Sequence, residues 1–166
     1  MSLFNYAPDE VDILVAGFIP VQGLADGTFI SISKDTLPFT AKRTPDGSVA
    51  RAAHRDQTYT IQITLHSGSS TNDMFTKLQI LDETTFTGKF PLLVKDQSGT
   101  DLFFSTSTWI EKPADIVKST SIDQRVWTLR SAHAVLNVGG NEETSSTLED
   151  IFNLAVGSIT TIQNIL

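Results

Sequence analysis

Residues 39–75, FTAKRTPDGSVARAAHRDQTYTIQITLHSGSSTNDMF, decide the fold, because three segments of different physical character follow one another there. Its central part, residues 58–66, alternates strictly between polar and apolar side chains. The apolar face carries Tyr59, Ile61, Ile63 and Leu65, and the polar face carries Thr58, Thr60, Gln62 and Thr64. A period of two in Thr-, Ile- and Tyr-rich sequence predicts a half-buried strand, and this is the strongest strand signal in the chain.

The segment before this strand, residues 39–57, has no apolar pattern and predicts a long loop with a turn at Thr44-Pro45-Asp46-Gly47. Loops of this length in a compact domain are commonly functional or lack a fixed structure. Its four basic residues outnumber its two acidic ones, so it carries +2 and the rest of the chain must carry −9 to give the overall −7. A basic loop on an acidic body favours self-association. The alternative is a solvated hairpin loop whose charge is incidental.

The segment after the strand predicts a surface helix over residues 71–82. Ser70 or Thr71 is the expected N-cap, and Asp73 falls in the first turn, where negative charge is favourable. One apolar stripe at helical spacing is formed by Met74, Phe75, Leu78 and Leu81. This stripe should pack against the outside of a sheet.

Further strands are expected at residues 11–15, 28–34, 90–95, 101–110 and 122–136, each bounded by turn residues. In the fourth of these, alternation predicts that Leu102, Phe104, Thr106 and Thr108 share one face and Phe103, Ser105, Ser107 and Trp109 the other. The fold class is therefore mostly β, an antiparallel β-sandwich or small barrel with one outer α-helix. A second, short C-terminal helix is predicted by the capping box that begins at Ser146.

The 166 residues are long enough for one domain with its own core. We divide it into an N-terminal arm (1–10), the long loop (39–57) and a C-terminal extension (141–166). No cofactor or metal is expected, because the chain has no cysteine and its three histidines, His54, His66 and His133, lack metal-ligand spacing. No nucleophile elbow or phosphate-binding glycine loop occurs, which argues against an enzyme. No stretch approaches a membrane span, and the N-terminus lacks the pattern of a signal peptide.

The order of turns, strands and aromatic residues resembles the proteins that build the tail tube of contractile-tailed bacteriophages. The resemblance covers residues 11–135 and contains no catalytic signature. Its matching pieces are Asp26-Gly27-Thr28, Ile30-x-Ile32, Phe39-Thr40, Pro45-Asp46-Gly47-x-Val49-x-Arg51, Ser70-x-Asn72-Asp73, Phe90-Pro91, Asp96-x-x-Gly99, Trp109-Ile110-x-Lys112-Pro113 and Val126-Trp127-x-Leu129.

The resemblance implies a virion structural protein that is assembled in the host cytoplasm. Six copies would form a ring, and stacked rings would make a hollow conduit for DNA ejection, in contact with sheath, baseplate and tail-terminator proteins. The acidic net charge of −7 suits a wall past which DNA moves without specific binding.

Two sets of site residues follow as hypotheses. The polar strand face, Thr58, Thr60, Gln62 and Thr64, would line the lumen. Contact with the adjacent ring would come from Phe39, Lys42, Arg43, Val49, Arg51 and Arg55. Two alternatives remain: a baseplate or fibre β-sandwich that binds a ligand through Trp109 or Trp127, and the tube protein of a secretion-type injection system.

Overall fold

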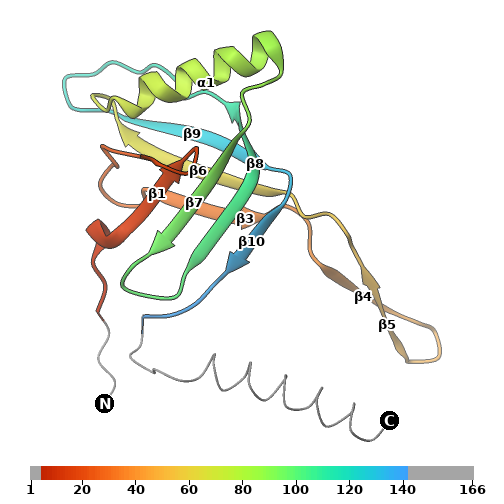
Figure 1. Ribbon diagram of the computed structural model, residues 1–166. Coiled ribbons are helices and arrows are strands. Elements are labelled where there is room, and N and C mark those ends of the chain that lie inside the picture. The colour runs from red at the N-terminus through yellow and green to blue at the C-terminus, as the bar shows by residue number, and fades with distance from the viewer. Residues whose placement is uncertain (1–4, 142–166) are drawn as a thin grey trace, which may run out of the picture.

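The computed structural model describes residues 5–141, which form ten strands, one α-helix and a short 3-10 helix (Figure 1). The elements are η1 (Pro8–Glu10), β1 (Val11–Val15), β2 (Ile19–Pro20), β3 (Ile30–Lys34), β4 (Phe39–Arg43), β5 (Val49–Ala53), β6 (Tyr59–His66), α1 (Thr71–Thr85), β7 (Phe90–Asp96), β8 (Leu102–Lys112), β9 (Gln124–Ser131) and β10 (Ala134–Asn137). The predicted second helix lies in 142–166, outside the described residues.

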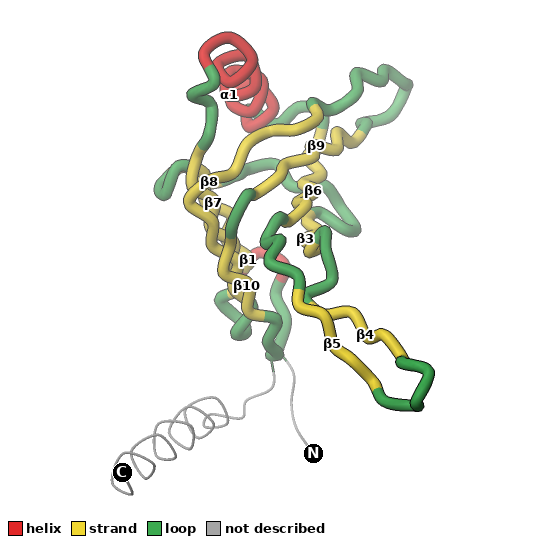
Figure 2. The backbone as a smooth tube through the Cα atoms, turned by 90° about the vertical axis from the view of Figure 1, so that its right-hand side faces the viewer, coloured by secondary structure: helices red, strands yellow, loops and turns green. Residues whose placement is uncertain are grey.

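Eight of the strands form one antiparallel sheet in the order β2-β1-β7-β8-β9-β6-β3, and β10 also pairs with β8. The first half of β8 lies between β7 and β10, and its second half pairs with β9. The sheet therefore bends at β8 into two layers that enclose the core (Figures 1 and 2). The mostly β, antiparallel fold class is confirmed, although the two layers belong to a single sheet.

The predicted apolar face of β6 is the centre of the core. Its four side chains are buried, together with residues of the facing strands and one helix residue. Those neighbours include Leu92, Phe103, Phe75, Trp127 and Leu129. Burial of this apolar surface is the main contribution to the stability of the domain.

Helix α1 packs against the sheet through a narrower stripe than the sequence predicted. Phe75 is fully buried, and Met74 and Leu78 are partly buried against the core. Leu81 remains 44% exposed, because by the third turn the helix extends beyond the sheet edge (Figure 1). At its start, the Ser70 side chain makes no capping bond; Ser69 Oγ accepts a hydrogen bond from the Thr71 amide instead (3.2 Å).

For the strand predicted at residues 101–110, the assignment of side chains to the two faces is wrong beyond Ser105. In β8, Phe103 and Ser105 are buried, but the buried positions then shift to Thr108 and Ile110. The cause is a β-bulge where β7 and β8 change register between Phe90 and Leu92. An extra residue in one strand moves every following side chain to the opposite face.

Residues 39–57 are not a structureless loop, which corrects the sequence prediction. Strands β4 and β5 pair antiparallel with each other, from Phe39 opposite Ala53 to Arg43 opposite Val49. All ten strand residues are exposed. An amphipathic pattern requires a buried face, and this hairpin has none within its own subunit, so hydrophobic periodicity gave no signal.

Candidate functional site

The β4–β5 hairpin projects from the body and pairs with no other strand of the described chain (Figures 1 and 2). Its tip is the predicted turn, in which Gly47 has a φ of +88° and its amide bonds to the Thr44 carbonyl (3.0 Å). The Asp46 carboxylate accepts hydrogen bonds from the Ser48 amide (3.2 Å), the Ser48 hydroxyl (2.7 Å) and the Thr44 hydroxyl. These bonds, led by that from Thr44, lower the pKa of Asp46 to about 2.

One face of the hairpin combines apolar and cationic side chains. Strand register places Phe39, Ala41, Arg43, Val49, Arg51 and Ala53 together on it. The Arg51 guanidinium carbon lies 4.2 Å from the centroid of the Phe39 ring, a diagonal cation–π contact between the strands. Lys42 lies on the opposite face. No carboxylate of residues 5–141 lies within 4.0 Å of Lys42, Arg43, Arg51 or Arg55.

The base of the hairpin is fastened to the sheet by hydrogen bonds. The Asp56 carboxylate accepts from the Thr36 hydroxyl (2.6 Å) and from the Thr58 amide (3.0 Å), and these bonds lower its pKa. Backbone bonds from Asp35 to Thr58 (3.0 Å) and from His54 to Pro38 (2.9 Å) join the two arms. The hairpin is thus held in a defined direction while its side chains stay exposed.

The second predicted site is the polar face of β6, which continues across the neighbouring strands. Gln62 lies between Ser31 of β3 and Thr128 of β9, and Thr60 lies between Ser33 and Arg130. Gln62, Ser31 and Ser33 are exposed, Thr60 and Thr58 are half-buried, and Thr64 is only 9% exposed. A hydroxyl- and amide-rich surface therefore spans three strands, and Thr64 contributes little to it.

An ionic network closes this face at the end nearest the hairpin. The Arg130 guanidinium contacts Asp35 (3.0 Å) and Glu111, and Asp35 also accepts from the Thr60 hydroxyl (2.5 Å). The hydrogen bond that Arg130 Nε donates to the Glu111 carboxylate raises the pKa of Arg130. This surface thus presents one cation paired with two carboxylates, together with uncharged polar groups, and it holds no concentration of cations that would bind a polyanion tightly.

A cleft of about 460 Å³ opens on the other side of the sheet, between β3 and the β7–β8–β10 layer. Its walls are mainly apolar, with Thr28, Asp96, Asp101 and Asn137 as polar members. The sequence gave no signal for this cleft, because its lining comes from six separate parts of the chain.

Neither tryptophan lines the cleft, where a ligand-binding module would need it. Trp127 is buried in the core, and half-buried Trp109 lies beside Arg130 on the polar face. Within residues 5–141 no three His, Asp or Glu side chains are arranged to hold a metal ion. No helix in that range has the length and hydropathy needed to cross a bilayer.

Comparison with known proteins gives one curated relative and several similar structures, and no family model matches the chain. The relative is structural protein ORF10 of Pseudomonas phage KPP10, 26% identical over 153 residues, with 88% of each chain covered.

Among solved structures, a chain of the virion of a native gene transfer agent particle superposes with a TM-score of 0.55 at 12% identity. The match covers 81% of this chain and all of that one. A chain of an extracellular contractile injection system, the PVC sheath/tube terminator in the extended state, superposes with a TM-score of 0.52 at 11% identity. That match covers 82% of this chain and 99% of the other. The chain therefore has the fold of subunits found in phage-like particles and contractile injection systems.

Proposed function

We propose that this protein is a structural subunit of a phage tail tube, without enzymatic activity, that forms hexameric rings which stack into a hollow conduit for DNA ejection. Support comes from similarity to a phage structural protein and from a fold shared with chains of a virion-like particle and a contractile injection system. Sheath, baseplate and tail-terminator proteins would be its partners in the virion tail.

The observation that carries the proposal is the β4–β5 hairpin. A two-stranded hairpin with every strand residue exposed is marginal on its own, so a partner surface is the expected source of its stability. Phe39, Lys42, Arg43, Val49, Arg51 and Arg55 are the proposed contacts to the adjacent ring. A hairpin that binds an equivalent site on the next copy generates an open stack when the operation does not close.

The polar face is the proposed lumen wall. Gln62 offers a neutral hydrogen-bonding group, and Thr58 and Thr60 offer hydroxyls, so DNA passing this wall finds no fixed cation cluster to hold it. Thr64 belongs to the same strand face but is covered within the subunit.

Electron microscopy of the purified protein at low salt tests the function. Hollow tubes of stacked rings are expected, and a preparation of dispersed monomers at every concentration would favour the baseplate or fibre module. Single rings that never stack would favour a second candidate, a ring that ends the tube, which the similarity to the sheath/tube terminator chain supports. A secretion-type tube would have the same appearance, and encapsidation of DNA in the native particle distinguishes it.

Reversal of hairpin charge tests the role of the hairpin. Arg51→Glu with Arg55→Glu should leave the thermal melt of the subunit unchanged and stop tube growth. Lys77→Glu with Lys89→Glu makes the same change in net charge at exposed sites away from the hairpin and should assemble. Normal tube growth of the Arg51/Arg55 variant at low salt would show that the hairpin does not stack the rings.

A further inference from the structure

We propose that the hairpin of one copy docks in the apolar cleft of a second copy, where the carboxylates around that cleft receive Arg43 and Arg51. This inference rests on the proposed self-assembly and names the surface that the hairpin binds. It commits the cleft to a second copy of this chain.

The cleft has the size and lining to take apolar side chains. Its volume of about 460 Å³ accommodates several of them, and its walls include Val11, Ile30, Val94, Phe103 and Leu136. Val138 lines it as well and is 80% exposed. An apolar cleft with exposed Tyr6 and Val138 in its lining favours a partner that covers it.

The edge of the sheet beside the cleft is acidic. Pairing of β1 with β7 sets Val11, a wall residue, opposite Asp96, and places Asp12 and the preceding η1 residues Asp9 and Glu10 along the same edge. A hydrogen bond from the Gln97 amide to the Glu10 carbonyl (3.0 Å) fixes η1 against the β7–β8 turn.

Exposed acidic side chains outnumber exposed basic ones along this edge. Asp9, Glu10, Asp12 and Asp101 are exposed, against the exposed cation Lys95 opposite Asp12. We call these four carboxylates the acidic rim. Their field attracts a cationic partner.

The mixed face of the hairpin complements this arrangement. Val49 is 63% exposed and Phe39 is 49% exposed, which gives two apolar groups for the cleft. Arg43, directly opposite Val49, and Arg51, stacked on Phe39, carry the charges that the rim would meet. Apolar burial and charge pairing would then act in the same contact, which favours one register over others.

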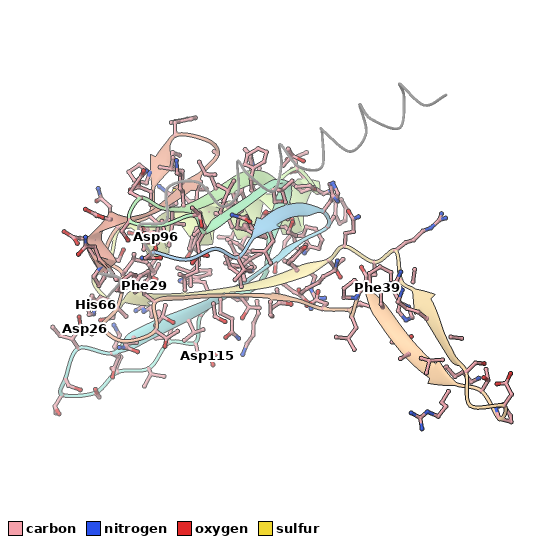
Figure 3. The ribbon with its side chains drawn as sticks, turned by 90° about the horizontal axis from the view of Figure 1, so that it is seen from below. Asp26, Phe29, Phe39, His66, Asp96 and Asp115 are labelled. Carbon is pink, nitrogen blue, oxygen red and sulfur yellow. The ribbon has the colours of Figure 1, made fainter. Side chains whose placement is uncertain are left out.

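The contact must join two copies, because one subunit cannot make it. Figure 3 shows Phe39 at the base of the hairpin, well separated from Asp96 beside the cleft, and the hairpin points away from that side. A contact between two different surfaces is heterologous and propagates from copy to copy, as a growing tube requires.

Disulfide trapping tests the contact directly, since the chain has no cysteine of its own. Val49→Cys and Val138→Cys proteins are purified separately, mixed and oxidised under assembly conditions. A disulfide-linked dimer is expected only from the mixture. Val49→Cys mixed with Ile116→Cys is the matched control, because Ile116 is 77% exposed and lies in the loop between β8 and β9, away from the cleft.

Charge exchange tests the rim. Asp9→Lys with Glu10→Lys should raise the protein concentration needed for assembly about tenfold, because attractive pairs become repulsive. Asp115→Lys with Glu83→Lys makes the same change in net charge at exposed sites that do not line the cleft, and should leave that concentration unchanged. Adding Arg43→Glu and Arg51→Glu to the Asp9/Glu10 variant should restore assembly.

Two results of disulfide trapping would overturn the inference. One is a dimer that forms with Ile116→Cys and not with Val138→Cys. The other is a disulfide within single subunits of a Val138→Cys, Phe152→Cys double variant, which would show that residues 142–166 of the same chain fill the cleft. If tubes form but rim reversal has no effect, this inference fails and the proposed function stands. If the Val49–Val138 dimer forms but microscopy shows no rings or tubes, the proposed function fails and the contact stands.

Discussion

Trp127 Nε1 donates a hydrogen bond to Asn72 Oδ1 at 2.8 Å, and this buried bond joins the middle of β9 to the first turn of helix α1. The Asn72 amide nitrogen in turn donates to the His66 carbonyl (2.9 Å) and the Ser69 carbonyl (3.0 Å). One side chain therefore satisfies the indole and adds a second hydrogen bond to the carbonyls of His66 and Ser69, which also accept from backbone amides. The Trp127 ring also packs edge-on against Phe75, with 5.4 Å between centroids.

Replacing Asn72 with alanine should destabilise the subunit by about 1–3 kcal/mol, because the buried indole N–H of Trp127 loses its partner. Urea unfolding of the non-assembling Arg51/Arg55 variant provides the measurement, since tubes would obscure the transition. Gln79→Ala, on the same helix but bonded only to exposed Glu83, should change stability by less than about 0.5 kcal/mol. Equal effects of the two substitutions would contradict the role assigned to Asn72.

Alanine substitution of the apolar residues of α1 should lower the free energy of unfolding more, the more deeply the residue is buried. Phe75→Ala should cost about 3–5 kcal/mol and half-buried Leu78→Ala about 2 kcal/mol, whereas Leu81→Ala should cost less than about 0.5 kcal/mol. The same unfolding experiment measures all three. A cost for Leu81→Ala as large as that for Leu78→Ala would show that the third turn of the helix is covered in solution.

Sequence reasoning located the sheet well where one face is buried and failed where none is. Ile61, Ile63 and Leu65 all occupy the core positions that their alternation predicted. The same method misread β4 and β5, because Val49 and Phe39 face solvent and their strands gain no buried side within the subunit. Only the turn at Pro45-Asp46-Gly47 was visible there, since its chemistry is local.

Long-range geometry was the other part that local patterns could not supply. The bulge that places both Thr108 and Ser105 in the core depends on how β7 pairs with β8, and no single strand encodes it. The cleft has the same origin, because Val11, Ile30 and Leu136 meet only after the sheet bends at β8.

Strong acidification should loosen the hairpin turn. The pKa of Asp46 is lowered from 3.8 to about 2 by its bonds to Thr44 and Ser48, so the ionised carboxylate stabilises the folded turn. That contribution is complete above the unfolded value of 3.8 and is lost as the pH falls through about 2. A carboxyl-carbon NMR titration should follow Asp46 with a midpoint near the lower value, and Asp46→Asn should remove the accompanying shift of the Ser48 amide, which donates to that carboxylate. An Asp46 midpoint near 4 would show that the turn bonds do not form in solution.

Labelling of assembled tubes tests the polar face of β6. If that face lines the lumen, a cysteine at Gln62, exposed between Ser31 and Thr128, should react with a small maleimide that enters the bore and resist a bulky polymer-linked maleimide. Lys77→Cys, exposed on α1, serves as the outer-surface control and should react with both reagents in tubes. In unassembled subunits the two cysteines should react equally with the bulky reagent, which separates protection by assembly from protection by folding.

Fast reaction of the Gln62 cysteine with the bulky reagent in intact tubes would place this face outside and assign the lumen to another surface. Full protection from both reagents would instead indicate burial between subunits.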